Sequence, residues 1–248
     1  MASDFLIKLA AEKLASAVHP VSFSGAGLSA ESGIATFRDS SDDAALWSKF
    51  DPQQLASQEG FRAAPEMVID WYNWRRQTLS GAKPNNAHRS LASLRGWWHI
   101  TQNVDNLLEA AGADVDRVLH LHGSLTEDHC NAGCGYVERI DLSCAPKLRR
   151  CECGSYMRPS VVWFGEVLPA SILQCAMIET QKADLMLVIG TSAQVYPAAG
   201  LIESALGNGA DIIVVNTESS DLSGKHVIEL VGPAGELLPE LIQGMHMK

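Results

Sequence analysis

The stretch VSFSGAGLSA at residues 21–30 decides how the fold is interpreted, because a short apolar run passes directly into a glycine turn. Val21–Ser24 has the length and residue types of a buried strand, and Gly25-Ala26-Gly27 follows where a helix could begin. Backbone without Cβ atoms approaches a pyrophosphate closely, and N–H groups at a helix start favour negative charge. The pattern therefore indicates a dinucleotide-binding turn, with an ordinary tight turn as the alternative. The acidic residue that a dehydrogenase carries about 20 positions later is missing, which argues against an ordinary dehydrogenase.

Five further apolar runs alternate with helical patterns, as expected for a parallel sheet covered by helices. They are Trp98–Gln102, Val118–Leu121, Leu185–Gly190, Ile212–Asn216 and, more weakly, His226–Leu230. The sequence therefore predicts an α/β fold.

Two stretches interrupt this alternation, and we expect both to be inserts that together form a smaller second domain. Residues 39–88 are helical in pattern and rich in aromatic side chains, and residues 123–159 hold most of the cysteines. The remaining residues, 1–38, 89–122 and 160–248, are left for the large domain.

The composition limits the class of protein. The chain has 248 residues, 46% of them hydrophobic, and a formal net charge of −10. An acidic chain lacks the basic surface that normally drives nonspecific binding to nucleic acid or an anionic membrane. No apolar run approaches the roughly 18 residues that a membrane span needs, and the amphipathic pattern near the N-terminus is unlike a secretory signal. We expect a soluble, cytoplasmic and monomeric protein with neither kind of partner.

Polar side chains and glycines recur where the predicted strands end. In an open α/β sheet, ligands bind beyond the carboxyl ends of the strands, so these positions are site candidates. The candidates by strand end are Gln102, Asn103 and Asp105; Gly190, Thr191 and Ser192; and Asn216, Thr217 and Glu218. His120 and His122 follow another apolar run, and a histidine near its ordinary pKa is the commonest general base. Either histidine could instead be structural.

The cysteines predict a structural metal site. Five of the six fall between residues 130 and 153, and clustering of this kind in a reducing compartment favours metal over disulfides. Four thiolates complete a closed Zn²⁺ shell, for which we expect Cys130, Cys134, Cys151 and Cys153, although Cys144 or His129 could replace one of them. Acidic and basic residues balance between residues 123 and 160, which argues against a nucleic-acid-binding zinc ribbon.

Longer motifs carry a family resemblance along nearly the whole chain. They are GAGLSAESGIATFRD from Gly25, TQNVDNL from Thr101, LHGS from Leu121, VVWFGE from Val161, GTSAQVYPAA from Gly190 and VVNTE from Val214. The chain resembles the sirtuins, which are NAD-dependent protein lysine deacylases. The resemblance implies a Rossmann-like parallel sheet with helices on both faces, a small zinc and helical domain, and NAD consumed as a co-substrate between them. Ala35 departs from the proline that is usual in the family.

The same resemblance assigns roles to the candidates. It implies that His122 is the base that activates a ribose hydroxyl, that Asn103 positions ribose or water, and that Asp105 holds the nicotinamide amide. Phe37 and Arg38 would lie on a loop that covers the site, and His120 is left without a role. The residues implied for NAD binding are Gly25, Ala26, Gly27, Ser29, Phe37, Arg38, Gln102, Asn103, Val104, Asp105, Gly190, Thr191, Ser192, Asn216, Thr217, Glu218 and Ala234.

Tyr72 and Arg75 suggest which acyl group is removed. We expect one helix from Phe61 to Leu79, which would put both side chains on the same face. Arginine offers a planar fork of donors that suits a carboxylate, so the pair could bind an acidic acyl group. The alternative interpretation is an aromatic packing face with a solvated arginine. The pair resembles the signature of sirtuins that remove succinyl and malonyl groups. Acyl-lysine substrates carrying succinyl, malonyl or acetyl groups are therefore expected.

Two further segments resemble those between which sirtuins hold the substrate backbone as an added strand. Their residues are Val162, Phe164, Gly165, Glu166 and Val195. Mono-ADP-ribosyl transfer at the same NAD site and a noncatalytic binding module are the alternative functions. The Tyr72 and Arg75 pair favours deacylation, because an acyl-specific pocket has no purpose in sugar transfer.

Overall fold

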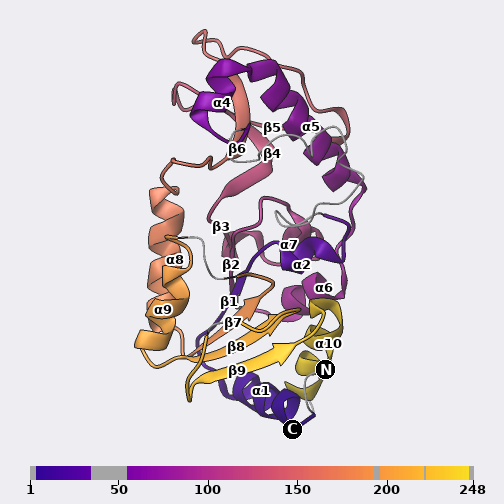
Figure 1. The fold of residues 1–248 in the computed structure, drawn as a ribbon, viewed down its shortest axis with the longest axis vertical. Helices are drawn as coiled ribbons and strands as arrows, with labels where there is room; N and C mark the ends of the chain where they lie inside the picture. Colours follow the sequence, from indigo (N-terminus) through magenta and orange to yellow (C-terminus); the bar gives the residue numbers. More distant parts are fainter. Residues whose placement is uncertain (1–3, 35–54, 193–195, 221, 246–248) are drawn as a thin grey trace.

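The computed structural model describes residues 4–34, 55–192, 196–220 and 222–245. Within these residues six strands form one parallel sheet in the order β3-β2-β1-β7-β8-β9 (Figure 1). Its strands are β1 (Pro20–Ser24), β2 (Trp98–Thr101), β3 (Val118–His120), β7 (Leu185–Ile189), β8 (Asp211–Asn216) and β9 (Val227–Val231). All six predicted apolar runs lie in this sheet, so the α/β prediction is confirmed.

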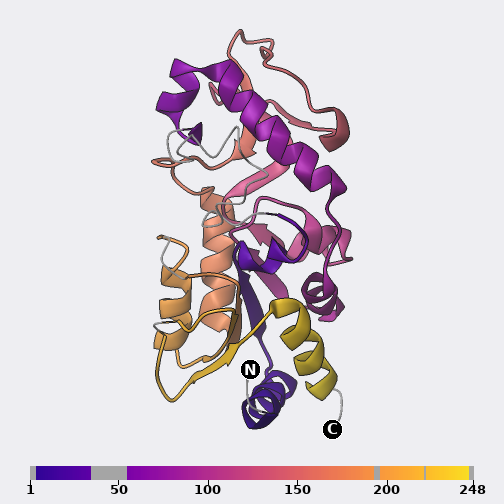
Figure 2. The ribbon, with the colours of Figure 1, turned by 45° about the vertical axis from the view of Figure 1, so that its right-hand side comes forward.

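Helices cover both faces of the sheet, as Figure 2 shows. One face packs against α1 (Asp4–Ser16), α6 (Asn86–Ser93) and α10 (Ala234–Met245), and the other against α8 (Ala170–Lys182) and α9 (Gly200–Gly207). Strand β7 shows why its sequence is a continuous apolar run. Leu187 is buried in the first face and Val188 in the second, because successive side chains of a strand point to opposite sides. None of the helices in the described ranges has the length and apolar character needed to cross a bilayer.

A smaller antiparallel sheet, ordered β5-β4-β6, lies beyond one end of the large sheet (Figure 1). Its strands are β4 (Gly123–Cys130), β5 (Val137–Arg139) and β6 (Met157–Val161), and it lies beside α4 (Gln58–Ala63) and α5 (Pro65–Gly81). The remaining short elements are α2 (Gly27–Ala30), α7 (Leu107–Ala110), η2 (Val115–Arg117) and η3 (Leu142–Cys144). The chain passes from β3 to β4 through Leu121 and His122, which joins the two sheets. The predicted residue limits of the two domains stay a prediction.

The helix expected from Phe61 to Leu79 is two helices, so the prediction of a continuous helix is wrong. α4 ends at Ala63 and α5 begins at Pro65, with Ala64 between them at φ −148° and ψ 68°. Proline has no N–H to donate into a preceding turn, and its ring disfavours helical backbone in the residue before it. Pro65 thus starts a helix instead of continuing one. Tyr72 and Arg75 both lie in α5.

Candidate active site

The glycine turn packs directly on the turn that follows β7. Gly25 N donates to Ile189 O at 3.0 Å, and Gly27 N donates to Gly190 O at 2.9 Å. A Cβ on Gly27 would lie 2.7 Å from Gly190 Cα, and one on Gly190, which has φ +57°, would lie 2.4 Å from Leu28 N. The glycines therefore let two backbones touch, and the segments predicted from two strand ends form one wall.

Hydrogen bonds join the polar groups at the ends of different strands to one another. Thr191 Oγ1 donates to Gln102 Oε1 at 2.9 Å, and Asn216 Nδ2 donates to Thr191 O at 3.2 Å. Ser192, Thr217 and Glu218 are exposed along the same edge. The ends of β2, β7 and β8 thus form a continuous polar rim, as the sheet topology predicts.

The start of α10 is tied to the same region. Ala234 is the first residue of α10, and the next residue, Gly235, donates its N–H to Glu31 Oε1 at 2.8 Å. Glu31 directly follows α2. This contact holds the predicted Ala234 near the glycine turn. Gly235 and Glu31 are 204 positions apart, so no local sequence pattern predicts their contact.

A buried polar cluster lies beside the glycine turn and includes one residue that sequence reasoning missed. Ser29 Oγ donates to Asp105 Oδ2 at 2.8 Å and accepts from Asn103 Nδ2 at 3.2 Å. His88 Nε2 lies 3.3 Å from the same hydroxyl, and burial lowers the pKa of His88 to about 4. The pKa of Asp105 is raised because burial outweighs its hydrogen bonds to Leu107 N and Ser29. His88 carries no motif of its own, so only the fold brings it to Ser29.

His122 has the protonation pattern of a base. Its Nδ1 donates to Gln102 O at 3.0 Å, which places the ring proton on Nδ1 and leaves Nε2 with its lone pair. Burial lowers the His122 pKa, so the ring is neutral near pH 7. A neutral imidazole with an unprotonated Nε2 can accept a proton from a hydroxyl.

His120 is bound differently. Its Nδ1 lies 2.9 Å from Asn103 O and its Nε2 lies 2.7 Å from Glu109 Oε1. Both partners are acceptors, so neither ring nitrogen offers a lone pair to a substrate. The structure thereby separates two histidines that the sequence leaves equivalent.

Tyr72 and Arg75 lie on one face of α5, one helical turn apart. Tyr72 is fully buried, and its hydroxyl accepts a hydrogen bond from Trp163 Nε1 at 2.9 Å. The Arg75 guanidinium is half-buried, 5.1 Å from the Trp71 ring centre and 5.7 Å from that of Tyr72. Burial raises the pKa of Tyr72 to about 12, whereas it lowers the pKa of Arg75, and Asp105 partly restores the latter. Both donors are therefore largely removed from solvent, with the Arg75 guanidinium packed beside two aromatic rings.

The segment after β6 connects Tyr72 to His122. Val162 N donates to His122 O at 2.9 Å, and Trp163 follows it with its side chain fully buried. Phe164 N donates to Ala56 O at 2.9 Å, and its ring is 50% exposed. Gly165 follows with φ +84°. Contacts thus run from Tyr72 through Trp163 and Val162 to His122.

Glu166 is expected to bind substrate, but its carboxylate accepts hydrogen bonds from three other residues of the chain. Oε1 accepts from Arg158 at 2.7 Å and from Gln58 at 2.9 Å, and Oε2 accepts from Trp163 N at 2.9 Å. The Arg158 guanidinium also lies 3.8 Å from the Trp163 ring centre. Glu166 therefore fixes the segment that carries Trp163.

The four predicted cysteines converge, and their arrangement fits zinc. In the described part of the chain, the sulfurs of Cys130, Cys134, Cys151 and Cys153 all lie within 4.8 Å of one another. Ligands at the Zn–S distance in a tetrahedron are roughly 3.8 Å apart, and two of the sulfur pairs lie at 3.3 and 3.6 Å, so small side-chain adjustments would give the tetrahedral spacing. Neither Cys144 nor His129 belongs to the group, and His129 Nδ1 lies 3.2 Å from Ser160 Oγ instead. Structural zinc held by four thiolates thus accounts for all four residues.

Three predicted site residues have no described geometry. Phe37, Arg38 and Val195 lie outside the described residues, as does Ala35. The other predicted residues lie in the glycine turn, the loop after β2, the polar rim, the buried cluster, the connection from β3 to β4, α5, the start of α10, the segment after β6 or the cysteine cluster. Val104 belongs to the loop after β2, where its carbonyl accepts from Leu125 N at 2.8 Å.

The chain matches a family model and curated relatives over most of its length. The model described as the Sir2 family matches residues 25–197. An NAD-dependent protein deacylase of Mycobacterium tuberculosis (strain ATCC 25618 / H37Rv) is 44% identical over 229 residues, covering 89% of this chain and 94% of the relative. Another, from Pseudomonas putida, is 43% identical over 250 residues, covering 96% and 94%.

Solved structures with the same fold contain both kinds of ligand expected from the sequence. A complex of a Sir2 homolog with NAD has a TM-score of 0.87 at 40% identity, covering 98% of this chain and 93% of that chain. A Sir2 protein bound to an acetylated peptide has a TM-score of 0.82 at 28% identity, covering 96% and 99%. The similarity therefore spans both sheets.

Proposed function

The chain belongs to the Sir2 family and is an NAD-dependent protein deacylase, and we propose that it prefers lysines carrying acidic acyl groups, succinyl and malonyl. The observation that supports this preference is the position of Tyr72 and Arg75 on one face of α5, where the Tyr72 hydroxyl accepts a hydrogen bond from Trp163 in the segment bonded to His122. Acetyl-lysine remains a substrate in this proposal, because a small neutral acyl group also fits a pocket built for a longer one.

Arg75 supplies the charge that an acidic acyl group needs. Burial lowers its pKa, which means that its surroundings penalise the guanidinium charge. A substrate carboxylate beside it would reduce that penalty and gain a charge-assisted hydrogen bond. An acetyl group provides neither effect.

Tyr72 supplies a neutral donor next to that charge. Its raised pKa of about 12 keeps the phenol protonated at physiological pH, so the hydroxyl retains a hydrogen to donate. The same oxygen also accepts a hydrogen bond from the indole N–H of Trp163. The pair thus offers a carboxylate one cationic and one neutral donor.

We propose the catalytic roles from the geometry of the rim and the buried cluster. His122 would take the proton of a ribose hydroxyl at Nε2, because Gln102 O fixes its other nitrogen as a donor. Asn103 and Asp105 would position the ribose and the nicotinamide amide, since Ser29 holds both side chains. NAD supplies the ribose that receives the acyl group. Gly25, Ala26, Gly27, the rim residues and Ala234 would bind the rest of NAD.

The substrate backbone would lie between the segment after β6 and the segment that contains Val195. The described part of this proposal is Val162, Phe164 and Gly165, which present a partly exposed edge beside His122. Glu166 acts indirectly, because its carboxylate holds Trp163 and Arg158 in place. Backbone pairing of this kind binds many sequences, so the acyl group, more than the flanking residues, would decide selection.

Replacing Arg75 with Met tests the acyl preference. A lost charge-assisted contact is worth about 1.5–3 kcal/mol, so kcat/KM for a succinyl-lysine peptide should fall tenfold to a hundredfold. Activity on an acetyl-lysine peptide of the same sequence should change by less than about threefold. Both rates are measured by nicotinamide release and by mass spectrometry of the peptide.

Arg117 provides a matched control, because its guanidinium lies 5.1 Å from the Trp98 ring centre, the distance that Arg75 has to Trp71. Arg117→Met should leave both activities unchanged. Equal losses on the two substrates in Arg75→Met would reject the acyl preference, whereas the assignment of the chain as a deacylase would still stand.

A further inference from the structure

His120 and His122 form hydrogen bonds with two consecutive backbone carbonyl groups of the loop after β2. His122 Nδ1 contacts Gln102 O at 3.0 Å, and His120 Nδ1 contacts Asn103 O at 2.9 Å. The loop they hold carries Asn103 and Asp105, whose side chains meet at Ser29. The position of that loop therefore depends on both imidazoles, although only one of them serves as the base.

The hydrogen bonds of His120 require a proton on each ring nitrogen. Its Nε2 lies 2.7 Å from Glu109 Oε1 of α7, and its Nδ1 faces a backbone carbonyl, which can only accept. A neutral imidazole would point a lone pair at one of these acceptors. The arrangement is satisfied by an imidazolium paired with an ionised Glu109 carboxylate.

We infer that His120 is a positioning residue for deacylation, a cationic clamp that is paired with Glu109 and holds the Asn103 carbonyl. The inference rests on the proposed function, in which the Asn103 and Asp105 side chains position ribose and nicotinamide. Asn103 is fixed on its other sides by Thr101 Oγ1, which accepts its N–H at 3.1 Å, and by Ser29. The clamp completes this set of contacts from the carbonyl side. His120 touches no reacting group in this scheme.

The charges around the clamp support this protonation state. Glu109 and Asp105 face His120, and His99 of β2 lies near Glu109. Burial alone would lower the His120 pKa, but the hydrogen bond and charge of Glu109 outweigh it and raise the pKa overall. Burial would raise the Glu109 pKa, and His120 more than offsets that effect. Glu109 Oε2 is buried without a hydrogen bond among the described residues, so His120 is the main compensation for this carboxylate.

Two substitutions separate the two contacts of His120. In His120→Asn, the amide nitrogen takes the place of Nδ1, keeps the contact with Asn103 O and loses Glu109. In His120→Gln, the amide nitrogen takes the place of Nε2, keeps the contact with Glu109 and loses Asn103 O. The inference predicts that kcat/KM falls about tenfold in His120→Gln and by less than about threefold in His120→Asn, with most of the loss in kcat. A merely structural role would make the two variants equivalent or reverse their order.

The pH profile of kcat/KM provides the second readout. The clamp is charged below the raised pKa of His120 and is lost as the pH rises through it, so the wild type should lose activity on the alkaline side. Glu109→Gln removes the anion, so this alkaline loss should begin at lower pH, whereas His120→Asn should abolish it. His226 forms a comparable pair with Asp211 at 3.1 Å on the far edge of the sheet, so His226→Asn and His226→Gln are controls that should keep wild-type activity.

Three results would overturn the inference. They are full activity in His120→Gln, a greater loss in His120→Asn than in His120→Gln, and an alkaline limb that neither Glu109→Gln nor His120→Asn moves. If His120→Gln does not fold, as judged by circular dichroism, the alkaline limb of Glu109→Gln decides alone.

Discussion

Backbone contacts alone explain why residue 190 is a glycine. It turns with φ +57°, and an added Cβ would lie 2.4 Å from Leu28 N and 2.7 Å from Gly27 Cα. Both neighbours are backbone atoms, which cannot rotate away. The glycine pattern of the turn after β1 is thus explained in part by packing against β7, independently of any bound pyrophosphate.

Gly190→Ala should therefore destabilise the protein even without NAD. We expect the free energy of unfolding to fall by about 1–3 kcal/mol in urea titrations, because the methyl group overpacks and alanine disfavours this backbone region. Gly207→Ala is the control, since a Cβ at Gly207 meets no atom within 4 Å and its backbone is helical. This control should gain up to about 1 kcal/mol. Equal effects in the two variants would contradict the packing explanation.

Among the elements, the small sheet links the cysteine cluster to His122, the proposed base. β4 leaves His122 and ends at Cys130, and β6 leads into Val162 and Trp163. The buried core around its metal end consists of Cys130, Cys151 and Met157. Leu125 and Val161, at the opposite end of the same sheet, pack in the larger core with α4 and α5, so the metal is expected to cross-link mainly the end that carries the cysteines.

Removing one thiolate should therefore lower the activity by loosening the small sheet. Cys134→Ser is expected to bind zinc substoichiometrically by elemental analysis, to lose amide hydrogen-exchange protection in β4 and β6, and to lose more than about tenfold in kcat/KM. Protection in β7 and β8 should persist. Cys144→Ser is the matched control, because Cys144 is exposed and outside the cluster, so it should keep its zinc and its activity. Unfolding of both sheets in Cys134→Ser would show that the metal stabilises more than this element.

The sequence predicts well those elements whose residue pattern lies within one short segment of the chain. β7 is apolar at every position because both of its faces are buried, and the cysteine spacing indicates a cluster without any fold. The contacts that escape prediction join segments far apart, such as His88 with Ser29 and Glu31 with Gly235. The break between α4 and α5 is a local feature that Pro65 itself indicates, although the predicted helix runs through it. The roles of the site residues stay a proposal.

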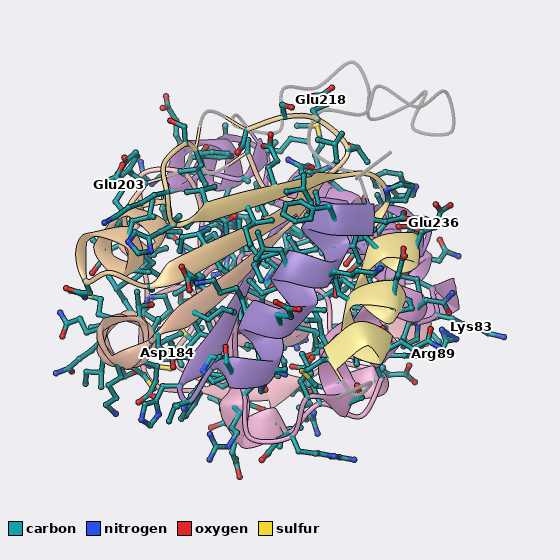
Figure 3. The ribbon with its side chains drawn as sticks, turned by 90° about the horizontal axis from the view of Figure 1, so that it is seen from below. Lys83, Arg89, Asp184, Glu203, Glu218 and Glu236 are labelled. Atoms are coloured by element: carbon teal, nitrogen blue, oxygen red, sulfur yellow. The ribbon has the colours of Figure 1, made fainter. Side chains whose placement is uncertain are left out.

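For the whole molecule, acid sensitivity follows from where the ionisable groups lie. In the end-on view of Figure 3, labelled charged side chains such as Asp184 and Glu236 lie around the outside, while the sheet runs through the middle. His99 is an exception, 2% exposed on a strand between β1 and β3. Burial lowers its pKa to about 4, although Glu109 partly opposes this shift. Because β2 is internal to the sheet, a proton can bind there readily only when the sheet opens.

Stability should therefore decline as the pH falls from about 6.5, the pKa of an unfolded histidine, towards about 4. In this window the unfolded chain binds the proton and the folded chain does not, which costs up to about 1.4 kcal/mol per pH unit for each such histidine. His88 acts in the same direction, whereas the raised pKa of His120 acts oppositely and favours the folded state at lower pH.

Urea unfolding of the wild type and His99→Asn, both saturated with zinc, isolates the contribution of His99 as the difference between two curves. That difference should shrink as the pH falls from 7 to 4.5. Ser22→Ala removes the 2.8 Å partner of His99 but not its burial, so it should retain the wild-type pH dependence. Parallel curves for the wild type and His99→Asn would show that the buried imidazole does not couple protonation to global unfolding.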